Sequence, residues 1–241
     1  MKRLLYIFLI TYIVCLTGCT TLSVTDFYHP FIPEDEKYLF ADSCFLQEGE
    51  TPLVFFSNDL DKDINKLQSK LFFIQGVSRF NGPGYDSEEL EAKIVELCIT
   101  ERAQCALYSQ NYTNTLHNLY SSSYGIYSSS TKRYDYTIVL FCMLPYPVYA
   151  SNPAGFMVAS LSDNDRENFH RNTGVMVNVV FDESAAYYAN VFKGDLITEI
   201  NGKEIKTLDD YYSIIEEAAL SGQVSLTLLR NNIPLEITYT L

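Results

Sequence analysis

The sequence has few of the side chains that enzymes most often use. Its 241 residues include three histidines, His29, His117 and His170, which lie far apart in the chain. A lone histidine is usually an ordinary surface or core residue. There is also no Gly-x-Ser-x-Gly segment, the turn that presents the nucleophilic serine of many hydrolases. We therefore expect no catalytic centre.

A calcium site is also not expected. Asp59, Asp61 and Asp63 have the 1-3-5 spacing of a calcium-binding loop. Ile64 and Lys70 occupy the positions where such a loop needs a glycine and a final acidic residue. Acidic side chains at the start of a helix explain the triplet better, because they interact favourably with its dipole. The sequence predicts no metal ion and no other cofactor.

Positive charge is scarce as well. The chain has 17 lysines and arginines against 30 aspartates and glutamates, a net charge of -13. Nucleic acids and anionic lipid headgroups attract protein surfaces of the opposite sign, so neither is an expected partner of the chain as a whole. Solubility is a sufficient explanation of this acidity.

The N-terminus has the pattern of an export signal over residues 1–18. Lys2 and Arg3 precede an apolar run, Leu4 to Leu16, which is too short to be read as a membrane span. The run ends in Leu16-Thr17-Gly18-Cys19, which resembles the lipobox of bacterial lipoproteins. The resemblance implies cleavage before Cys19, acylation of its thiol and stable anchoring by palmitate-type chains. An ordinary secretory signal is the alternative.

The residue after Cys19 bears on location. It is Thr20, whereas an aspartate at this position would resemble the signal that retains lipoproteins in the inner membrane. The lipobox resemblance therefore implies the outer membrane of a bacterial cell envelope. Of the six cysteines, Cys15 would be removed with the signal peptide and Cys19 would be acylated. An exported protein can oxidise the other four, for which three pairings are possible, and their spacing contains no CxxC pair that would indicate zinc. They are Cys44, Cys98, Cys105 and Cys142.

Residues 19–50 are predicted to be a tether, because they contain Pro30, Pro33 and a mixed charge cluster with little periodicity. Residues 51–145 alternate strand and helix patterns and predict a small α/β (or α+β) domain. Ser121 to Ser130 is expected to be a flexible hairpin loop. The expected elements are a buried strand at Leu53–Ser57, helices at Leu60–Leu71 and Asp86–Glu101, and strands at Leu71–Phe80, Gln104–Ser109, Tyr112–Tyr120 and Tyr134–Met143.

A linker at 146–154 leads to a second domain at 155–241. Asn190 is expected to end a short helix that starts at Ser184, and Asn201-Gly202 is a strong hairpin signal. The remaining pattern is a strand at Phe156–Leu161, an irregular or helical stretch at Ser162–Arg171, a strand at Val175–Phe181, a long helix at Asp209–Ala219, and strands at Val224–Arg230 and Leu235–Leu241 joined by an Asn231-Asn232 turn. This order resembles a bacterial PDZ domain of the kind attached to periplasmic proteases. The resemblance implies a β-barrel-like fold with two helices.

The PDZ resemblance also implies a peptide-binding site. An extended peptide, usually a C-terminus, would add as a strand beside the strand that starts at Val175. The amides of Gly174, Val175 and Met176 match the loop that binds the terminal carboxylate, and an apolar terminal residue is expected on the ligand. The pocket for that residue would be lined by Val175 and Val177, with Tyr211, Tyr212 and Ile215 across the groove.

The first domain resembles an uncharacterised α/β module found before PDZ domains in some bacterial lipoproteins. In that module a strand ends in a Gly-x-Ser-x-Phe-Asn turn, and Gly76 to Asn81 fits it. The sequence therefore predicts a non-catalytic, lipid-anchored envelope adaptor that binds a protein or peptide and no nucleic acid. A structural subunit without a free peptide ligand is one alternative. An enzyme with its site around Ser78, Arg79 and Asn81 is another.

Overall fold

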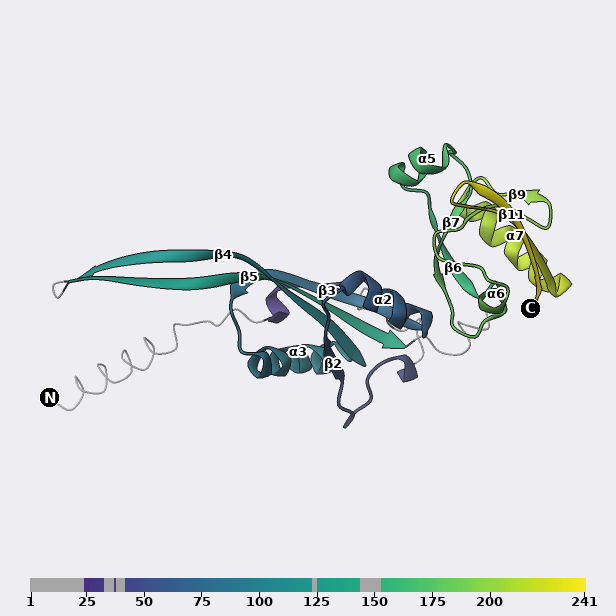
Figure 1. Cartoon of the computed structure of the whole chain (residues 1–241). Coiled ribbons are helices and arrows are strands. Elements are labelled where there is room, and N and C mark those ends of the chain that lie inside the picture. The colour runs from purple at the N-terminus through teal and green to yellow at the C-terminus, as the bar shows by residue number, and fades with distance from the viewer. Residues whose placement is uncertain (1–23, 33–36, 38–41, 123–124, 144–152) are drawn as a thin grey trace.

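The computed structural model describes residues 24–32, 37, 42–122, 125–143 and 153–241. They form two regions, each built on its own β-sheet (Figure 1). The predicted signal peptide and Cys19 lie outside the described residues, as does most of the predicted linker at 146–154. Within the described ranges, no helix has both the length and the apolar composition that crossing a bilayer requires.

The first region is a five-stranded sheet in the order β1-β3-β5-β4-β2. Helix α2 (Leu60–Ser69) packs on one face of the sheet, and helix α3 (Ser87–Glu101) packs on the other. This is the predicted mixed α/β arrangement. The described strands and short 3-10 helices include β1 (Tyr28–Pro30), β2 (Leu53–Phe56), β3 (Phe72–Pro83), β4 (Cys105–Ser122), β5 (Gly125–Met143), η1 (Val24–Phe27) and η3 (Asp42–Cys44).

Both long helices of this region begin at a capping aspartate. Asp59 accepts a hydrogen bond from the amide of Lys62, and Asp86 accepts one from the amide of Glu88. A side-chain oxygen at this position satisfies an amide that has no partner within the helix. The acidic triplet that begins at Asp59 therefore belongs to a helix start, as the sequence predicts.

The predicted tether is wrong for its described residues. η1 and β1 pack on the first sheet, and β1 pairs with β3 along Tyr28 to Pro30. The sequence did not indicate this packing, because the segment contains prolines and its apolar residues have no regular spacing. They are buried by tertiary contacts with the sheet. The buried ones are Val24, Ile32, Cys44, Phe45 and Leu46.

Two strand predictions in this region also need correction. β2 was expected to be buried, but it is the edge strand of the sheet, so Leu53, Phe55 and Phe56 are exposed. β4 is one strand instead of two, because a bulge between Tyr112 and Asn114 lets pairing with β5 continue through the polar interruption. The strands therefore extend through most of the predicted hairpin loop.

The Gly-x-Ser-x-Phe-Asn motif lies within β3 and forms no turn. Alternate residues of a strand share a face, and Gly76, Ser78 and Phe80 face the N-terminal segment. A side chain at Gly76 would collide with the ring of Tyr28. The buried hydroxyl of Ser78 donates a hydrogen bond of 2.8 Å to the carbonyl oxygen of Val24. The motif therefore holds residues 24–28 against the sheet.

Replacing Ser78 should destabilise the folded chain. Ser78→Ala leaves the buried carbonyl of Val24 without this donor, so we expect the free energy of unfolding to fall by about 1–2 kcal/mol. Urea unfolding followed by circular dichroism measures the change. Ser128→Ala, at an exposed position of β5, is the matched control and should have little effect. Equal stability of the Ser78→Ala variant and the unchanged protein would contradict this role.

The second region has a sheet in the order β11-β10-β8-β7-β6, with β9 paired to β8. Its core lies between this sheet and the helices α6 and α7, and is built from Phe156, Val175, Val177, Ile215 and similar residues. The stretch predicted as irregular or helical contains helix α5. The elements are β6 (Phe156–Ser160), α5 (Asp163–Phe169), β7 (Val175–Val180), α6 (Ala185–Tyr188), β8 (Leu196–Ile200), β9 (Lys203–Glu204), α7 (Leu208–Ser221), β10 (Gln223–Arg230) and β11 (Ile233–Thr240).

Asparagines occupy the left-handed turn positions that the sequence predicts. Asn190 follows α6 with φ of 60°, and Asn201 has φ of 51° in the turn between β8 and β9. Asn231 and Asn232 join β10 to β11 with φ of 52° and 65°. Asparagine tolerates this conformation better than most residues with a side chain, so local chemistry sets these turns.

The cysteines of the first region are buried. Removal from water raises the pKa of the thiols of Cys98, Cys105 and Cys142 to about 12, and neighbouring cysteines add a smaller upward contribution. A raised pKa keeps a thiol protonated at neutral pH, and the protonated form is the unreactive one.

We therefore expect the folded chain to resist thiol reagents. At pH 8 the thiolate fraction is very small and the sulfur atoms are covered, so DTNB should react slowly with the folded protein. In guanidinium chloride the same thiols should react rapidly, which provides the control. Rapid reaction of the folded chain would contradict the burial of these residues.

Candidate functional site

The strand predicted to receive a peptide is not available for pairing. β7 lies inside the sheet, where it pairs with β6 along its length and with β8 at Val175 and Met176. A strand has two hydrogen-bonding edges, so a peptide cannot add at Val175 to Val177. The predicted position beside the strand starting at Val175 is therefore wrong.

The predicted pocket residues on that strand also have other roles. Val175 and Val177 are fully buried in the core cluster. Gly174 packs closely on β8, where an added Cβ would lie 2.8 Å from the carbonyl oxygen of Ile197. These residues hold the sheet together and do not line an open groove.

Within the described residues, β6 and β11 are the two ends of this sheet, and β6 is the open edge that lies beside α7. The carbonyl oxygen of Gly155 accepts a hydrogen bond from the amide of Phe181, so this carbonyl faces β7, and the amide of Phe156 in the same planar peptide faces away from β7. Backbone groups alternate in direction along a strand. Those of Val158 and Ser160 therefore face away from β7. They give β6 the main-chain pattern that an added strand requires.

The loop that enters β6 is held in a single conformation by the core. The carbonyl oxygen of Gly155 accepts a second hydrogen bond, of 3.0 Å, from the hydroxyl of Ser184. The carbonyl oxygen of Ala154 accepts one of 2.9 Å from the hydroxyl of Tyr239. In a planar trans peptide the carbonyl and the next amide point in opposite directions. The amide of Gly155 is therefore turned away from Tyr239.

Gly155 is required at this position for two reasons. Its φ is +77°, a conformation that residues with a Cβ rarely adopt. An added Cβ would also lie 2.7 Å from the Cβ of Ser184. Gly155 is the last residue of the loop, and β6 begins at the next residue, Phe156. The conformation of Gly155 therefore sets the direction in which β6 begins.

Helix α7 lies beside β6 and carries the other predicted residues. Tyr211 packs its ring at 6.2 Å from that of Phe156 and is buried, as is Ile215 one turn later. Burial raises the pKa of Tyr211, so its hydroxyl stays protonated. Tyr212 is exposed on the outer side of the helix. The structure thus brings Tyr211 and Ile215 to β6, and not to the strand that the sequence indicated.

An ion pair between Asp195 and Arg230 stabilises the turn after α6. The carboxylate of Asp195 accepts hydrogen bonds of 2.7 Å from Arg230 at both of its oxygens, and one from the amide of Phe192. This bonding raises the pKa of Arg230. The guanidinium also lies 4.3 Å from the centre of the Phe192 ring. The pair has a structural function, because its polar groups are satisfied by one another.

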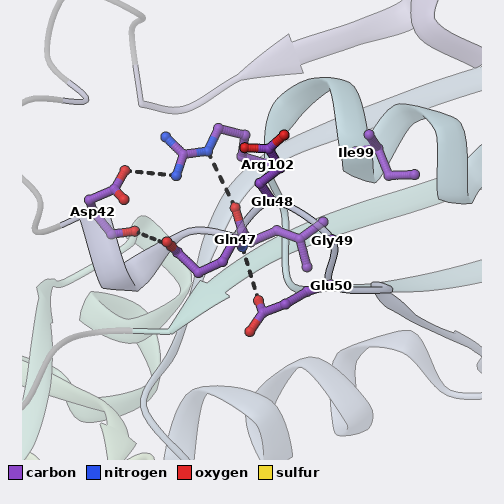
Figure 2. A pocket seen from close by; sticks show the side chains of 8 residues that line it. Asp42, Gln47, Glu48, Gly49, Glu50, Ile99 and Arg102 are labelled. Atoms are coloured by element: carbon purple, nitrogen blue, oxygen red, sulfur yellow. Dashed lines mark hydrogen bonds and ion pairs between the residues drawn. The ribbon is translucent and has the colours of Figure 1, made fainter.

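A pocket of about 730 Å³ in the first region is formed by the segment 42–50 and the end of α3 (Figure 2). Arg102 donates a hydrogen bond of 2.7 Å to Asp42 and another to the carbonyl oxygen of Leu46. Gln47 bonds the backbone of Asp42 and Phe45, and its amide bonds Glu50. The polar groups that line the pocket thus form hydrogen bonds with one another. The bonds of Arg102 hold the segment 42–50 against the end of α3.

The residues of the enzyme hypothesis do not form one site. Ser78 is buried and bonded to Val24, whereas Arg79 is exposed on the opposite face of β3. Asn81 accepts a hydrogen bond of 2.8 Å from Arg133 and donates one to Asp135. In the described part of the chain, no group of three or more histidine, cysteine, aspartate or glutamate residues is placed to hold a metal ion.

The second region matches known proteins. Residues 176–230 fit the family model described as "PDZ domain". A protein of Hahella chejuensis, "Probable periplasmic serine endoprotease DegP-like", is 28% identical over 84 residues, which are 35% of this chain and 18% of that protein. The chain therefore spans less than a fifth of that relative's length.

Solved structures of low identity have also been found. The HtrA3 PDZ domain bound to a phage-derived ligand (FGRWV) is 20% identical, covering 36% of this chain and 80% of that chain, with a TM-score of 0.30. The PDZ domain of EpsC from Vibrio cholerae is 14% identical, covering 36% and 93%, with a TM-score of 0.28. From the family match and the curated relative, the C-terminal region is a PDZ domain of the periplasmic-protease type.

The candidate site residues that the sequence did not indicate are Gly155 and those of the β6 edge. One signal was present, a glycine directly before an apolar strand at the start of the domain. The sequence could not show that β6 is an edge strand, because strand order in a sheet depends on long-range pairing.

Replacing Gly155 should damage both the loop and the site. Gly155→Ala adds a Cβ at positive φ and against Ser184, so we expect a loss of about 1–3 kcal/mol in unfolding free energy. Thermal unfolding measures this loss. Gly194→Ala is the matched control, since it has a φ of +90° but no atom within 4 Å of the added Cβ. A larger loss in the control would show that the contact with Ser184 is unimportant.

Proposed function

We propose that this protein is a lipid-anchored adaptor of the bacterial cell envelope, whose PDZ domain binds a peptide C-terminus or an extended strand along β6. It performs no catalysis in this proposal. The single observation that carries the proposal is the open edge of β6 beside α7. The loop before this strand is fixed by the hydrogen bond from Ser184 to Gly155. The chain departs from its protease-type relative in that the match covers the PDZ region alone.

Affinity would come from the main chain of β6, and selectivity from side-chain pockets. The amide of Gly155 lies at the start of the strand, where the terminal carboxylate of an added peptide would arrive. The neighbouring surface is apolar, because Phe156, Tyr211 and Ile215 are buried in the core beneath the β6 edge and Val158 is partly buried on β6 itself. A ligand with an apolar last residue therefore fits this surface better than one that ends in a charged side chain.

Anchoring in the proposal depends on Cys19, the predicted acylation site. Acyl chains would hold the protein at the outer membrane with its two domains in the periplasm or at the cell surface. The folded part would begin at Val24 and not near residue 51, because η1 and β1 belong to the first sheet. The separating tether is thus much shorter than the sequence indicated.

Panning a phage library of random free C-termini against residues 20–241 tests the function. We expect enrichment of peptides with apolar last residues. Amidation of a selected peptide should weaken binding roughly tenfold or more, because the charged acceptor is lost. Fluorescence anisotropy measures both forms. Equal binding of the two forms, or no enrichment, would rule out C-terminal recognition.

A proline at Val158 tests the strand that we assign. The Val158 amide faces away from β7, so Val158→Pro removes a donor to the ligand without removing a bond between β6 and β7. We expect roughly tenfold weaker binding and a nearly unchanged unfolding temperature. Val158→Ala, which keeps the amide, should bind more tightly than the proline variant. Full binding by Val158→Pro would place the ligand elsewhere.

A further inference from the structure

The first region has an open strand edge of its own. Within the described residues, β2 is an end strand of the sheet, and the strand that it pairs with there is β4. The two strands are parallel, with Leu53 opposite Cys105. A strand has two hydrogen-bonding sides, so one side of β2 is unused in the described chain.

The direction of the backbone groups along β2 shows which of them are open. The amides of Leu53 and Ser57 donate hydrogen bonds of 3.0 Å and 2.8 Å to backbone carbonyl oxygens in and just before β4. Backbone groups alternate in direction along a strand, so those of Val54 and Phe56 face away from β4. These two residues give β2 the main-chain pattern that an added strand requires.

Large apolar side chains are exposed along this edge. Leu53 is 60% exposed, Phe55 is 47% exposed and Phe56 is 50% exposed. Phe55 lies on the α2 face of the sheet, because it is paired with Leu107, whose side chain packs with residues of α2. Phe56 lies on the other face, with its ring 5.4 Å from that of Tyr108. A segment that adds to β2 would therefore meet apolar surface on both faces.

A pocket of about 320 Å³ lies beside this edge. Its apolar lining comes from β2, α2 and β4, and its charged lining comes from α2. The lining residues are Phe55, Phe56, Asp63, Lys66, Leu67, Lys70 and Leu107. Because two of them belong to the edge strand, a side chain on the α2 face of an added strand would lie next to the pocket.

The charge of the pocket lining differs from that of the whole chain, which has a net charge of -13. Lys66 and Lys70 are exposed, and within the described residues neither forms an ion pair. The carboxylate of Asp63 accepts a hydrogen bond of 2.7 Å from the hydroxyl of Ser57 and so has a partner in the protein. An acidic segment would be attracted to the two lysines, whereas most of the protein surface would repel it.

A second copy of this chain fits the edge less well than an acidic partner does. Antiparallel pairing of two β2 strands would place both α2 helices on the same face of the joined sheet. Lys66 and Lys70 of one copy would then approach the same residues of the other copy, and like charges repel. Lysine beside an edge strand is also a common protection against self-pairing. The edge therefore favours a different chain that carries negative charge.

We propose that the β2 edge binds an extended, acidic segment of a partner protein, which adds as a strand to the first sheet. Its main chain bonds the outward groups of Val54 and Phe56. An apolar side chain of the segment enters the pocket beside Phe55, and a carboxylate on the same face pairs with Lys66 or Lys70. The protein then has a strand-adding site in each region, which goes beyond the PDZ site of the proposed function.

Panning a phage library of short linear peptides, displayed without free C-termini, against residues 20–241 supplies a probe. We expect enrichment of peptides in which aspartate or glutamate alternates with large apolar residues. Fluorescence anisotropy then measures the affinity of a selected peptide. Its binding should weaken as sodium chloride is added, because salt screens the attraction to the exposed lysines.

Substitutions assign the binding to the β2 edge. Lys66→Glu reverses a charge, and Val54→Pro removes an outward amide without removing a bond to β4, so each should weaken binding roughly tenfold. Lys62→Glu is the matched control, because Lys62 is exposed on α2 and does not line the pocket. Both this control and Val158→Pro, the variant of β6, should bind as the unchanged chain does. Circular dichroism checks that each variant is folded.

Hydrogen exchange followed by NMR locates the contact. In the free chain, the amides of Val54 and Phe56 should exchange rapidly, whereas those of Leu53 and Ser57 should exchange slowly because they are bonded to the β4 side. The selected peptide should slow exchange at Val54 and Phe56 roughly tenfold or more and leave the amide of Val158 unchanged.

Several results would overturn the proposal. They are no enrichment of acidic peptides, full binding by Lys66→Glu or Val54→Pro, an equal loss in Lys62→Glu, or slow exchange of the outward amides in the free chain. Dimerisation of the free chain that Val54→Pro abolishes would assign the edge to a second copy instead. Loss of binding in Val158→Pro alone would assign the peptide to the PDZ domain, so the two sites succeed or fail independently.

Discussion

Main-chain hydrogen bonding between strands determines where this protein can receive a peptide. In the C-terminal sheet, β7 pairs on both sides, and the described chain leaves β6 at the edge. Two inward carbonyl groups, of Ala154 and Gly155, fix the direction of the loop that begins β6. The apolar wall on α7 follows from the same packing, since Tyr211 rests on Phe156. The proposed function of the PDZ domain depends on the β6 edge.

A second set of long-range contacts organises the first region. Gly76, Ser78 and Phe80 together hold η1 and β1 on β3, and Arg102 holds the segment that begins at Asp42 to the end of α3. The described residues of the predicted tether are thus part of the domain. In sequence, the first described residue, Val24, is only five positions after Cys19.

The two regions carry different surfaces at opposite ends of the molecule (Figure 1). Strands β4 and β5 of the first region extend away from the PDZ domain at one end, and the PDZ domain with its β6 edge is at the other. The regions also touch, because the amide of Asp182 bonds the carbonyl oxygen of Ser69, and Lys193 bonds Asn65. An adaptor that is held at a membrane and recruits a peptide has a use for this separation of its two surfaces.

Local chemistry in the sequence was sufficient for many elements. Helical spacing and capping aspartates predicted α2 and α3, and asparagines predicted the turns at Asn190, Asn201 and Asn231. The order of strands and helices after Gly155 predicted the PDZ domain. Each of these signals acts within a few residues of the chain, so it can be read without knowing the fold.

Tertiary structure decided the features that involve distant residues. The burial of Val24 depends on Ser78, the continuity of β4 depends on its pairing with β5, and the edge position of β6 depends on which strands pair elsewhere. Pairing with residues far along the chain leaves no fixed spacing in the sequence. The sequence by itself therefore determined that a PDZ domain is present, and only the tertiary structure decided that β6 lies at an edge of its sheet in the described chain, because an edge is defined by the absence of a neighbour.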